Sequence, residues 1–490
     1  MMMHASAIMF RIPCVLAVAL LGAVTPAGAE EETAVDIEGR RELFVDRHLI
    51  EDLNGTTLRL HTPVPAETVF QFDKPWEGLY CGYVTVLKAG DTFRLYYRGL
   101  PESKADGSNL ETTCCAESAD GIHWTRPSLG LFEVAGMRDN NVILSGMAPF
   151  SHNFAPFVDA RPGVAAEARY KALAGTSKSG LAAFASADGL RWKKLREQPV
   201  LTEGAFDSQN VAFWSEAEGC YVCYFRTWTE GGFGGVRTVS RATSPDFLHW
   251  SDPAPMAFGD TPIEHLYTNQ TRPYFRAPHI YIAIAARFMP GRRVVTTAQF
   301  EALGGQATYS GDCSDTVFMT SRGGNAYDRT FMESFVRPGI GLSNWTSRTN
   351  YPAYGVVPTA DAEMSMYVQR NYGQPTHHLQ RLALRTDGFV SVNAPYAGGE
   401  VQTKPMRFHG EELRINYSTS AAGSIWVEIQ DAAGTPLPGF SREDSDEIIG
   451  DEIERVVTWK GKSDVGALSG RPVRVRFIMK DADLYSIRFQ

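Results

Sequence analysis

The sequence predicts an all-β protein, a five-bladed β-propeller followed by a β-sandwich, and three observations lead to this prediction. A short turn motif recurs along the chain, alternating strands precede each copy of it, and the pattern changes near Asp387. The composition agrees: among 490 residues there are 45 glycines and 11% aromatics, and leucine-rich helical periodicity is scarce. Such a chain favours many strands joined by tight turns.

The turn motif reads Ser, any residue, Asp, three residues, Trp. It occurs as SADGIHW from Ser118, SADGLRW from Ser186 and SPDFLHW from Ser244, and weaker copies begin at Ser321 and Thr386. The five starts are 68, 58, 77 and 65 residues apart. We expect the Ser and Asp side chains to bond the turn backbone and the Trp to pack between neighbouring units. Asp120, Asp188 and Asp246 are therefore predicted to shape turns and to do no chemistry.

Each copy of the turn belongs to a larger unit. An alternating strand rich in aromatic and β-branched residues precedes it, as in 92–99, 169–175, 220–228, 280–288 and 364–372, and another strand precedes that one. The unit is strand, hairpin, strand, loop, strand, turn, strand. Five such units around an axis form a propeller, which leaves no long exposed sheet edge.

The domain boundaries follow from these patterns. Residues 1–29 are predicted to be a secretory signal peptide, with one Arg, an apolar core and Ala27-Gly28-Ala29 before the cleavage point. The propeller spans residues 60–387, and residues 388–490 form the sandwich. Residues 30–59 precede the first blade, and the stretch from Arg41 to Pro63 could supply a strand that closes the last blade. The protein is expected to be secreted or periplasmic.

Composition also excludes some functions. The formal charge of −9 has no basic block to offset it, so nucleic acid is not an expected partner. After cleavage no membrane partner is expected, and the oligomeric state stays open. Six cysteines remain, and their spacing shows no zinc site, so buried free thiols are preferred over disulfides. His152, His265, His377 and His378 form no recognisable metal set, and no cofactor is implied.

The turn at Ser244-Pro-Asp-Phe-Leu-His-Trp250 resembles that of five-bladed glycoside hydrolases, in particular families 32 and 43, and the C-terminal sandwich is similar to the family 32 arrangement. The turn also resembles the Asp-box of sialidases, with different spacing. The resemblance implies three central carboxylates, one at the start of the innermost strand in each of the first three blades. This chain departs from that pattern in blade two, where Asn153 stands in place of the Asp.

Three carboxylates stand before predicted innermost strands and are the candidate catalytic residues. Glycoside hydrolysis needs one group to protonate the leaving oxygen and another to act as nucleophile or to activate water. Glu77, Asp207 and Glu264 occupy this position in blades one, three and four. Each of these three carboxylates could equally be a solvent-exposed residue or one that shapes a turn.

An Arg recurs near the end of the second strand in four blades, namely Arg98, Arg226, Arg287 and Arg370. Because strand direction alternates within a blade, these ends should lie where the innermost strands begin. The four could pair with acids of neighbouring blades, or they could hold an anionic sugar, since guanidinium groups bind carboxylate and sulfate in a bidentate way. With Asn153, His265 and Tyr267 they form the predicted substrate-binding set.

The sequence thus predicts an exported glycoside hydrolase that acts on a poly- or oligosaccharide, anionic if the Arg residues reach it, by carboxylate acid/base catalysis. One alternative is a non-catalytic carbohydrate-binding propeller, which Asn153 favours because an amide transfers no proton at neutral pH. The other is a sialidase-like enzyme with an Arg cluster and Tyr267 or Tyr354 as nucleophile.

Overall fold

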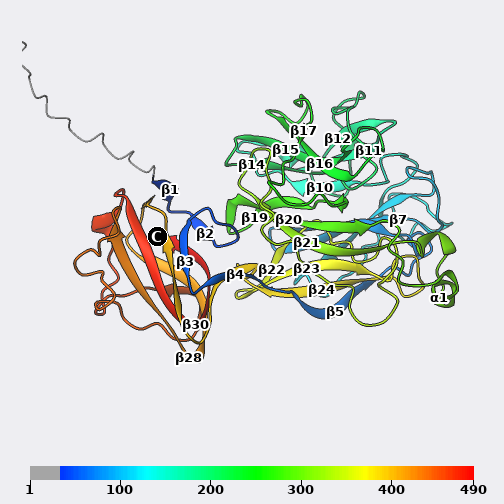
Figure 1. Cartoon of the computed structure of the whole chain (residues 1–490). Helices are drawn as coiled ribbons and strands as arrows, with labels where there is room; N and C mark the ends of the chain where they lie inside the picture. Colours follow the sequence, from blue (N-terminus) through cyan, green and yellow to red (C-terminus); the bar gives the residue numbers. More distant parts are fainter. Residues whose placement is uncertain (1–33) are drawn as a thin grey trace, which may run out of the picture.

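The structure, a computed structural model, describes residues 34–490, and almost all of their regular structure is β (Figure 1). The prediction of an all-β, five-bladed propeller is confirmed. The predicted signal peptide, residues 1–29, lies outside the described residues. Within residues 34–490 no helix is long and apolar enough to cross a membrane.

The propeller consists of five sheets that follow one another along the chain. Blade one contains β6 (Gly82–Ala89), β7 (Thr92–Gly99), β8 (Thr112–Ser118) and β9 (Val142–Leu144). Blade two contains β10 (Ala155–Val158), β11 (Tyr170–Thr176), β12 (Gly180–Ser186) and β13 (Lys193–Lys194). Blade three contains β14 (Val211–Ser215), β15 (Cys220–Trp228), β16 (Arg237–Ser244) and β17 (Ala254–Pro255).

Blades four and five depart from this plan. In blade four the inner strand is split into β18 (Leu266–Thr268) and β19 (Thr271–Tyr274), which both pair with β20 (Ala277–Met289), and β20 also pairs with β21 (Cys313–Ser321). The short helix α1 (Thr297–Ala302) lies between β20 and β21. Blade five contains β22 (Val357–Ala360), β23 (Glu363–Arg370), β24 (His378–Arg385) and, as its outer strand, β5 (Val64–Gln71).

The inner strands meet around one axis. β6 contacts β10, β10 contacts β14, β14 contacts β19, and β22 returns to β6. The Gln270 side chain donates to the Gln209 side chain at 2.7 Å and to the Pro352 carbonyl at 2.9 Å, which links blades three, four and five. Apolar clusters fill the space between each pair of neighbouring blades. The ring is therefore closed by apolar packing between blades and by amide hydrogen bonds on the axis.

The turn motif is structural, as predicted. Ser118 Oγ accepts from the Gly121 amide at 2.9 Å, Asp120 Oδ1 accepts from two later amides at 2.8 Å, and Trp124 Nε1 donates to the Gly121 carbonyl at 3.1 Å. The same bonds recur in the next two copies, and the three Trp rings pack against clusters between blades. Gly121 has a φ of 77°, and its counterpart Phe247 has a φ of 72°, so the third copy places a bulky residue in the left-handed region.

The expectation that the stretch from Arg41 to Pro63 closes the last blade is wrong. The strands of this stretch pair with the C-terminal sheet instead: β3 (Ile50–Asn54) pairs with β26 (Gly399–Thr403), and β4 (Thr57–Leu60) pairs with β25 (Val390–Ala394). The closing strand is the next one, β5, which pairs with β24. Alternating strands of this length carry no mark of which sheet they join, so the sequence could not separate β4 from β5.

This pairing creates a two-stranded connection between the two parts of the molecule. β4 and β5 are consecutive along the chain, and so are their partners β25 and β24. Between the two pairings the His61 amide donates to the Phe389 carbonyl at 2.9 Å. We call residues 57–71 with 378–394 the connecting ribbon.

The C-terminal part is one ten-stranded sheet that curls around a single apolar core (Figure 1). The long strands β28 (Leu413–Asp431) and β30 (Val473–Phe489) pair along most of their length, with a register shift near Thr419. The remaining strands are β1 (Val35–Glu38), β2 (Arg41–Leu43), β27 (Met406–Phe408) and β29 (Asp451–Val456). Strands from both ends of the described chain therefore complete one sheet.

The junction between propeller and sheet is built on Asp387, which is fully buried. Its Oδ1 accepts from the Tyr274 hydroxyl at 2.7 Å, and its Oδ2 accepts from Ser486 Oγ at 2.7 Å, Arg276 Nη1 at 2.9 Å and Asn416 Nδ2 at 3.1 Å. Asp387 belongs to the weak fifth copy of the turn motif, and its side chain joins the two parts of the molecule instead of shaping a turn.

All six cysteines of the described residues are free thiols, and five of them are buried. Burial raises the pKa of the Cys81, Cys114, Cys115 and Cys223 thiols, so these groups are protonated and unreactive at neutral pH.

Candidate functional site

The inner strands begin, and the second strands end, at one end of the propeller, which we call the mouth. Strand pairing shows this directly: Gly82 at the start of β6 lies opposite Arg98 near the end of β7, and Leu266 at the start of β18 lies opposite Arg287 of β20. The loops between second and third strands lie at the same end. A group of Arg, Tyr and Asp side chains from these positions forms what we call the axial cluster.

Asp207 and Arg226 are its first pair. They form an ion pair between Asp207 Oδ2 and Arg226 Nη2, with 20% of the Asp207 side chain exposed and only 4% of the Arg226 side chain. The guanidinium of Arg226 also lies over the Tyr267 ring, 4.6 Å from its centre. Arg226 thus contacts both the candidate acid Asp207 and Tyr267, which was predicted from another blade.

The side chains of Asn153 and Tyr83 hold the backbone around Asp207. The fully buried Asn153 amide donates to the Phe206 carbonyl at 2.5 Å and to the Ser208 carbonyl at 2.7 Å, and the Tyr83 hydroxyl donates to the Asp207 carbonyl at 3.0 Å. Asn153 also donates to the Gly175 carbonyl at 2.9 Å. With its amide used in this way, Asn153 positions Asp207, and the prediction that it contacts substrate finds no support in its geometry.

Tyr267 lies among cations. Arg348 lies 6.0 Å from its ring centre, Arg237 lies 5.5 Å away, and the ring of Tyr351 packs on it at 4.9 Å. Burial alone would raise the pKa of Tyr267, but the charges of Arg348 and Arg226 outweigh it and lower the pKa below 10. A buried phenol with this direction of shift indicates a site whose net field favours negative charge.

The other Tyr considered as a nucleophile, Tyr354, is placed differently. It is buried, and its hydroxyl donates to the Ala212 carbonyl at 3.2 Å. Burial raises its pKa to about 12. Tyr354 therefore supports the packing of blades three and five and has no free hydroxyl at the mouth.

Two carboxylates that the sequence analysis missed join the cluster. Asp312 directly precedes β21, and burial raises the pKa of its carboxyl, against the opposing effects of Ser347, Arg348 and Arg237. Asp106, in the loop between β7 and β8, lies 3.9 Å from His152 and acts electrostatically on Tyr267. Both come from connections between a second and a third strand. The alternation of strand direction that located the Arg residues would also have located these two.

The remaining predicted residues of the cluster are Arg98 and His265. Arg98 donates to the Tyr80 carbonyl at 3.0 Å and lies over the Tyr83 ring at 4.8 Å. His265 Nδ1 accepts from the Arg237 amide at 3.2 Å, and burial together with Arg237 lowers the pKa of this imidazole. His265 is therefore neutral at pH 7.

Many buried polar atoms of the axial cluster have no hydrogen-bond partner in the described part of the chain. They include both donors and acceptors, namely Arg98 Nε, Arg226 Nε and Nη1, the Tyr351 hydroxyl, His152 Nε2, Asp207 Oδ1 and Asp312 Oδ1. Buried polar groups in folded proteins are nearly always paired, so a concentration of unpaired ones marks a place that water or a ligand completes.

Four predicted site residues lie outside this cluster. Glu77 is fully buried and bonds Arg126 at 2.7 and 2.9 Å as well as the Tyr97 hydroxyl, so it supports the packing of blade one. Glu264 pairs with Arg287 at 2.9 Å and with Arg329, and Arg287 also pairs with Asp315 at 2.6 Å.

The fourth of them, Arg370, donates to Gln380 Oε1 at 3.0 Å and to Asn350. Each of the four has polar partners within its own blade or the next one. The sequence shows the residue type and the strand position, but not whether the side chain turns toward the axis or outward.

Comparisons with known proteins give a fold likeness only. No family model matches the chain, and no curated protein matches it. Similar solved structures include an N-acetylgalactosamine deacetylase from F. plautii in complex with blood group B trisaccharide, at 12% identity over 69% of this chain and 95% of that chain, with a TM-score of 0.41. A structure named glycoside hydrolase is 11% identical over 69% of this chain and 92% of that chain, with a TM-score of 0.40.

A third structure comes from the GH130 family of mannoside phosphorylases, described as containing glycoside hydrolases that target β-1,2-mannosidic linkages in Candida mannan. It is 14% identical over 69% of this chain and 95% of that chain, with a TM-score of 0.37. Membership of families 32 or 43 stays a prediction.

Proposed function

We propose that the protein is a glycoside hydrolase whose axial cluster binds and cleaves an anionic glycan. The observation that carries the proposal is the set of buried, unpartnered donors around Arg226 and Arg98, which lies beside Arg348, a cation that forms no ion pair with any carboxylate of the described residues. A carboxylate or sulfate group would supply the missing acceptors in a bidentate way.

The two carboxyl groups have different surroundings, which suits acid/base work. Asp312 has a raised pKa and an unpartnered Oδ1, so it would carry the proton that the leaving oxygen receives. Asp207, held against Arg226 and with its backbone clamped, would act as nucleophile or as the base that activates water. Asp207 and Asp312 both lie within electrostatic range of Arg237.

The test is sugar release by residues 30–490 from neutral, uronic, sulfated and sialylated oligosaccharides, compared with Asp207→Asn and Asp312→Asn. We expect release from anionic substrates only, and a loss of about a hundredfold or more in kcat in each variant. The matched control is Glu264→Gln, a carboxylate bonded in blade four, which should retain activity. Equal loss in Glu264→Gln, or release from neutral substrates alone, would contradict the assignment.

A second candidate is a carbohydrate-binding propeller without catalysis. Its support is that buried amides gather at or just before the inner strands of blades two to four, namely Asn153, Gln209, Asn210, Asn269 and Gln270. Tight binding of an anionic glycan with no release from any substrate, unchanged in Asp312→Asn, would favour it.

A sialidase-like reaction would require the Tyr267 hydroxyl as nucleophile. It is distinguished by Tyr267→Phe: full activity in this variant excludes a Tyr nucleophile, and a covalent adduct on Tyr267 trapped with a fluorinated substrate would establish it.

Export is part of the proposal. Amino-terminal sequencing of the protein recovered outside the cytoplasm should begin at Glu30, because the Ala27-Gly28-Ala29 stretch is of the kind that signal peptidase cleaves.

A further inference from the structure

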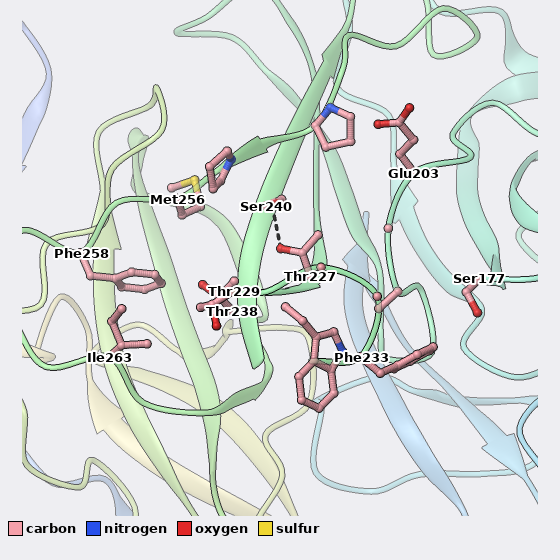
Figure 2. Close-up of a pocket in the computed structure, with 17 residues that line it drawn as sticks. Ser177, Glu203, Thr227, Thr229, Phe233, Thr238, Ser240, Met256, Phe258 and Ile263 are labelled. Carbon is pink, nitrogen blue, oxygen red and sulfur yellow. Dashed lines mark hydrogen bonds between the residues drawn. The ribbon is translucent and has the colours of Figure 1, made fainter. Parts of the chain in front are cut away.

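A large hollow lies beside the axial cluster, over blade three. It has a volume of about 750 Å³ and is lined by residues of the loop before β14, of β15, β16 and β17, and of the chain that follows β17. Figure 2 shows Phe258 and Ile263 on one side, Phe233 on another, and Thr227, Thr229 and Thr238 between them. We call this hollow the blade-three groove.

The groove differs in chemistry from the axial cluster. Its walls are rings and aliphatic groups, including Trp228, Phe233, Phe258 and Met256, and hydroxyl groups interrupt them at Ser177, Thr229 and Thr238. Among residues 34–490, Glu203 is the one charged residue that lines it, and no Lys or Arg does. Apolar faces combined with scattered hydroxyls suit an uncharged polyhydroxy ligand, because a sugar ring presents both C–H faces and hydroxyl groups.

Side-chain contacts connect the groove to the axial cluster. Phe233 packs edge-on to Trp228 at 6.0 Å, the Arg237 guanidinium lies 4.4 Å from the Trp228 ring centre, and Arg237 reaches Tyr267 at 5.5 Å. Trp228 Nε1 is buried and has no hydrogen-bond partner among the described residues, so a donor is available where the groove borders Arg237. Trp228 of the groove and Tyr267 of the axial cluster therefore both contact Arg237.

Phe233 is exposed in a way that packing does not explain. It lies in the hairpin loop between β15 and β16, in the stretch Gly231-Gly232-Phe233-Gly234-Gly235, and 58% of its surface is exposed. Gly231, Gly232 and Gly235 have φ values of 76°, 54° and 78°, a conformation that other residues rarely adopt. The loop thus holds an aromatic ring at the edge of a hollow at a cost in conformational entropy, which suits a ligand contact.

We infer that the blade-three groove binds the uncharged part of a glycan chain whose anionic sugar occupies the axial cluster. This inference rests on the proposed function for the identity of the anionic end, while the groove itself is argued from its own lining. It implies that the natural substrate is a chain of several sugars and not a single anionic sugar.

The experiment separates the groove from the axial site. Uncharged hexasaccharides of gluco, manno and galacto configuration are titrated into the wild type, Phe233→Ala and Tyr396→Ala by calorimetry. Tyr396 is the matched control, an aromatic side chain of the C-terminal part with 66% of its surface exposed. We expect at least one hexasaccharide to bind the wild type and Tyr396→Ala equally, and Phe233→Ala about tenfold more weakly.

Absence of binding by every hexasaccharide, or equal binding in all three proteins, would overturn the inference. Kinetic measurements then separate the groove inference from the proposed function. With an anionic substrate of several sugars, Phe233→Ala should raise KM about tenfold, and with an anionic aryl monosaccharide it should leave KM unchanged. Hexasaccharide binding without hydrolysis of any substrate would leave the groove established and the hydrolase proposal refuted. If Phe233→Ala hydrolyses both substrates with the same KM as the wild type, the hydrolase proposal stands and the groove inference is refuted.

Discussion

Two regions of this molecule contain the same kinds of residue in opposite states. At the junction, both oxygens of Asp387 accept hydrogen bonds, from Tyr274, Arg276, Asn416 and Ser486. In the axial cluster, Asp207 Oδ1 and two donor atoms of Arg226 have no hydrogen-bond partner within residues 34–490. Residue type is therefore a poor guide to function here, and the state of hydrogen bonding separates a structural Arg–Asp–Tyr group from a candidate site.

The largest expected effect tests the two aspartates against each other. Asp387→Asn should lower the free energy of unfolding by about 3–5 kcal/mol, because Arg41 and Arg276 are left beside a neutral group in a buried place. Asp207→Asn should cost less, about 1–2 kcal/mol, because Asp207 makes a single ion pair in the described chain, to Arg226, and 20% of its side chain is exposed, whereas Asp387 is fully buried. Urea unfolding followed by tryptophan fluorescence measures both. Similar losses in the two variants would remove the distinction drawn above.

Lowering the pH tests the junction side of the comparison. Glu42 of β2 bonds His279 at 2.7 Å and Arg322 at 2.8 Å of blade four. Burial alone would raise the pKa of Glu42, but these partners outweigh it and lower the pKa to about 2. Because the folded-state pKa is depressed, the stabilisation is complete above about pH 4.5 and is lost as pH falls toward 2, by about 3 kcal/mol.

The measurement is the free energy of unfolding of the wild type and Glu42→Gln between pH 2 and 7. The two curves should differ most at pH 7 and converge near pH 2. Parallel curves would show that Glu42 is not the group that titrates.

A third test addresses the axial side. Arg226→Met should weaken the binding of an anionic glycan about 30-fold or more, since it removes a buried cation and leaves Asp207 unpaired. The control is Arg241→Met, another buried Arg of blade three that pairs with Glu218 at 2.7 Å, which should alter stability but not affinity. If the two variants bind equally well, the axial cluster is not the anion site.

The smallest effect concerns the repeated turn. Ser118→Ala removes the acceptor of the Gly121 amide and should lower the free energy of unfolding by about 1 kcal/mol, with kcat and KM unchanged. A change in kinetics without a change in stability would assign the motif a role at the mouth.

The sequence supports the fold well because the fold depends on repetition. Three copies of the Ser-x-Asp turn, each with a Trp seated between blades, define the unit, and the strand alternation defines its four strands. The sequence does not show which strands pair when they lie far apart along the chain. β4 and β5 are adjacent and similar in pattern, yet one joins β25 of the C-terminal sheet and the other joins β24 of blade five.

The sequence predicts only part of the candidate site, because strand position does not show which way a side chain points. Asp207, Arg226 and Tyr267 were found because strand position alone places them at the mouth. Glu77 and Glu264 satisfy the same positional rule, but their side chains are bonded to Arg126 and Arg287. Asp312 directly precedes β21, so strand direction would have placed it at the mouth. Arg348 lies in a loop, and only the folded chain shows that it approaches Tyr267.

The connecting ribbon has a mechanical consequence. Two bodies joined by one strand can rotate about it. In the connecting ribbon, β4 and β5 instead pair with β25 and β24, so hydrogen bonds hold it at both ends. Asp387, between β24 and β25, adds its own bonds there. Torque applied to the C-terminal sheet is transmitted into the outer edge of blade five instead of being absorbed by a hinge. Any surface that holds the sheet would therefore also fix the direction in which the mouth points.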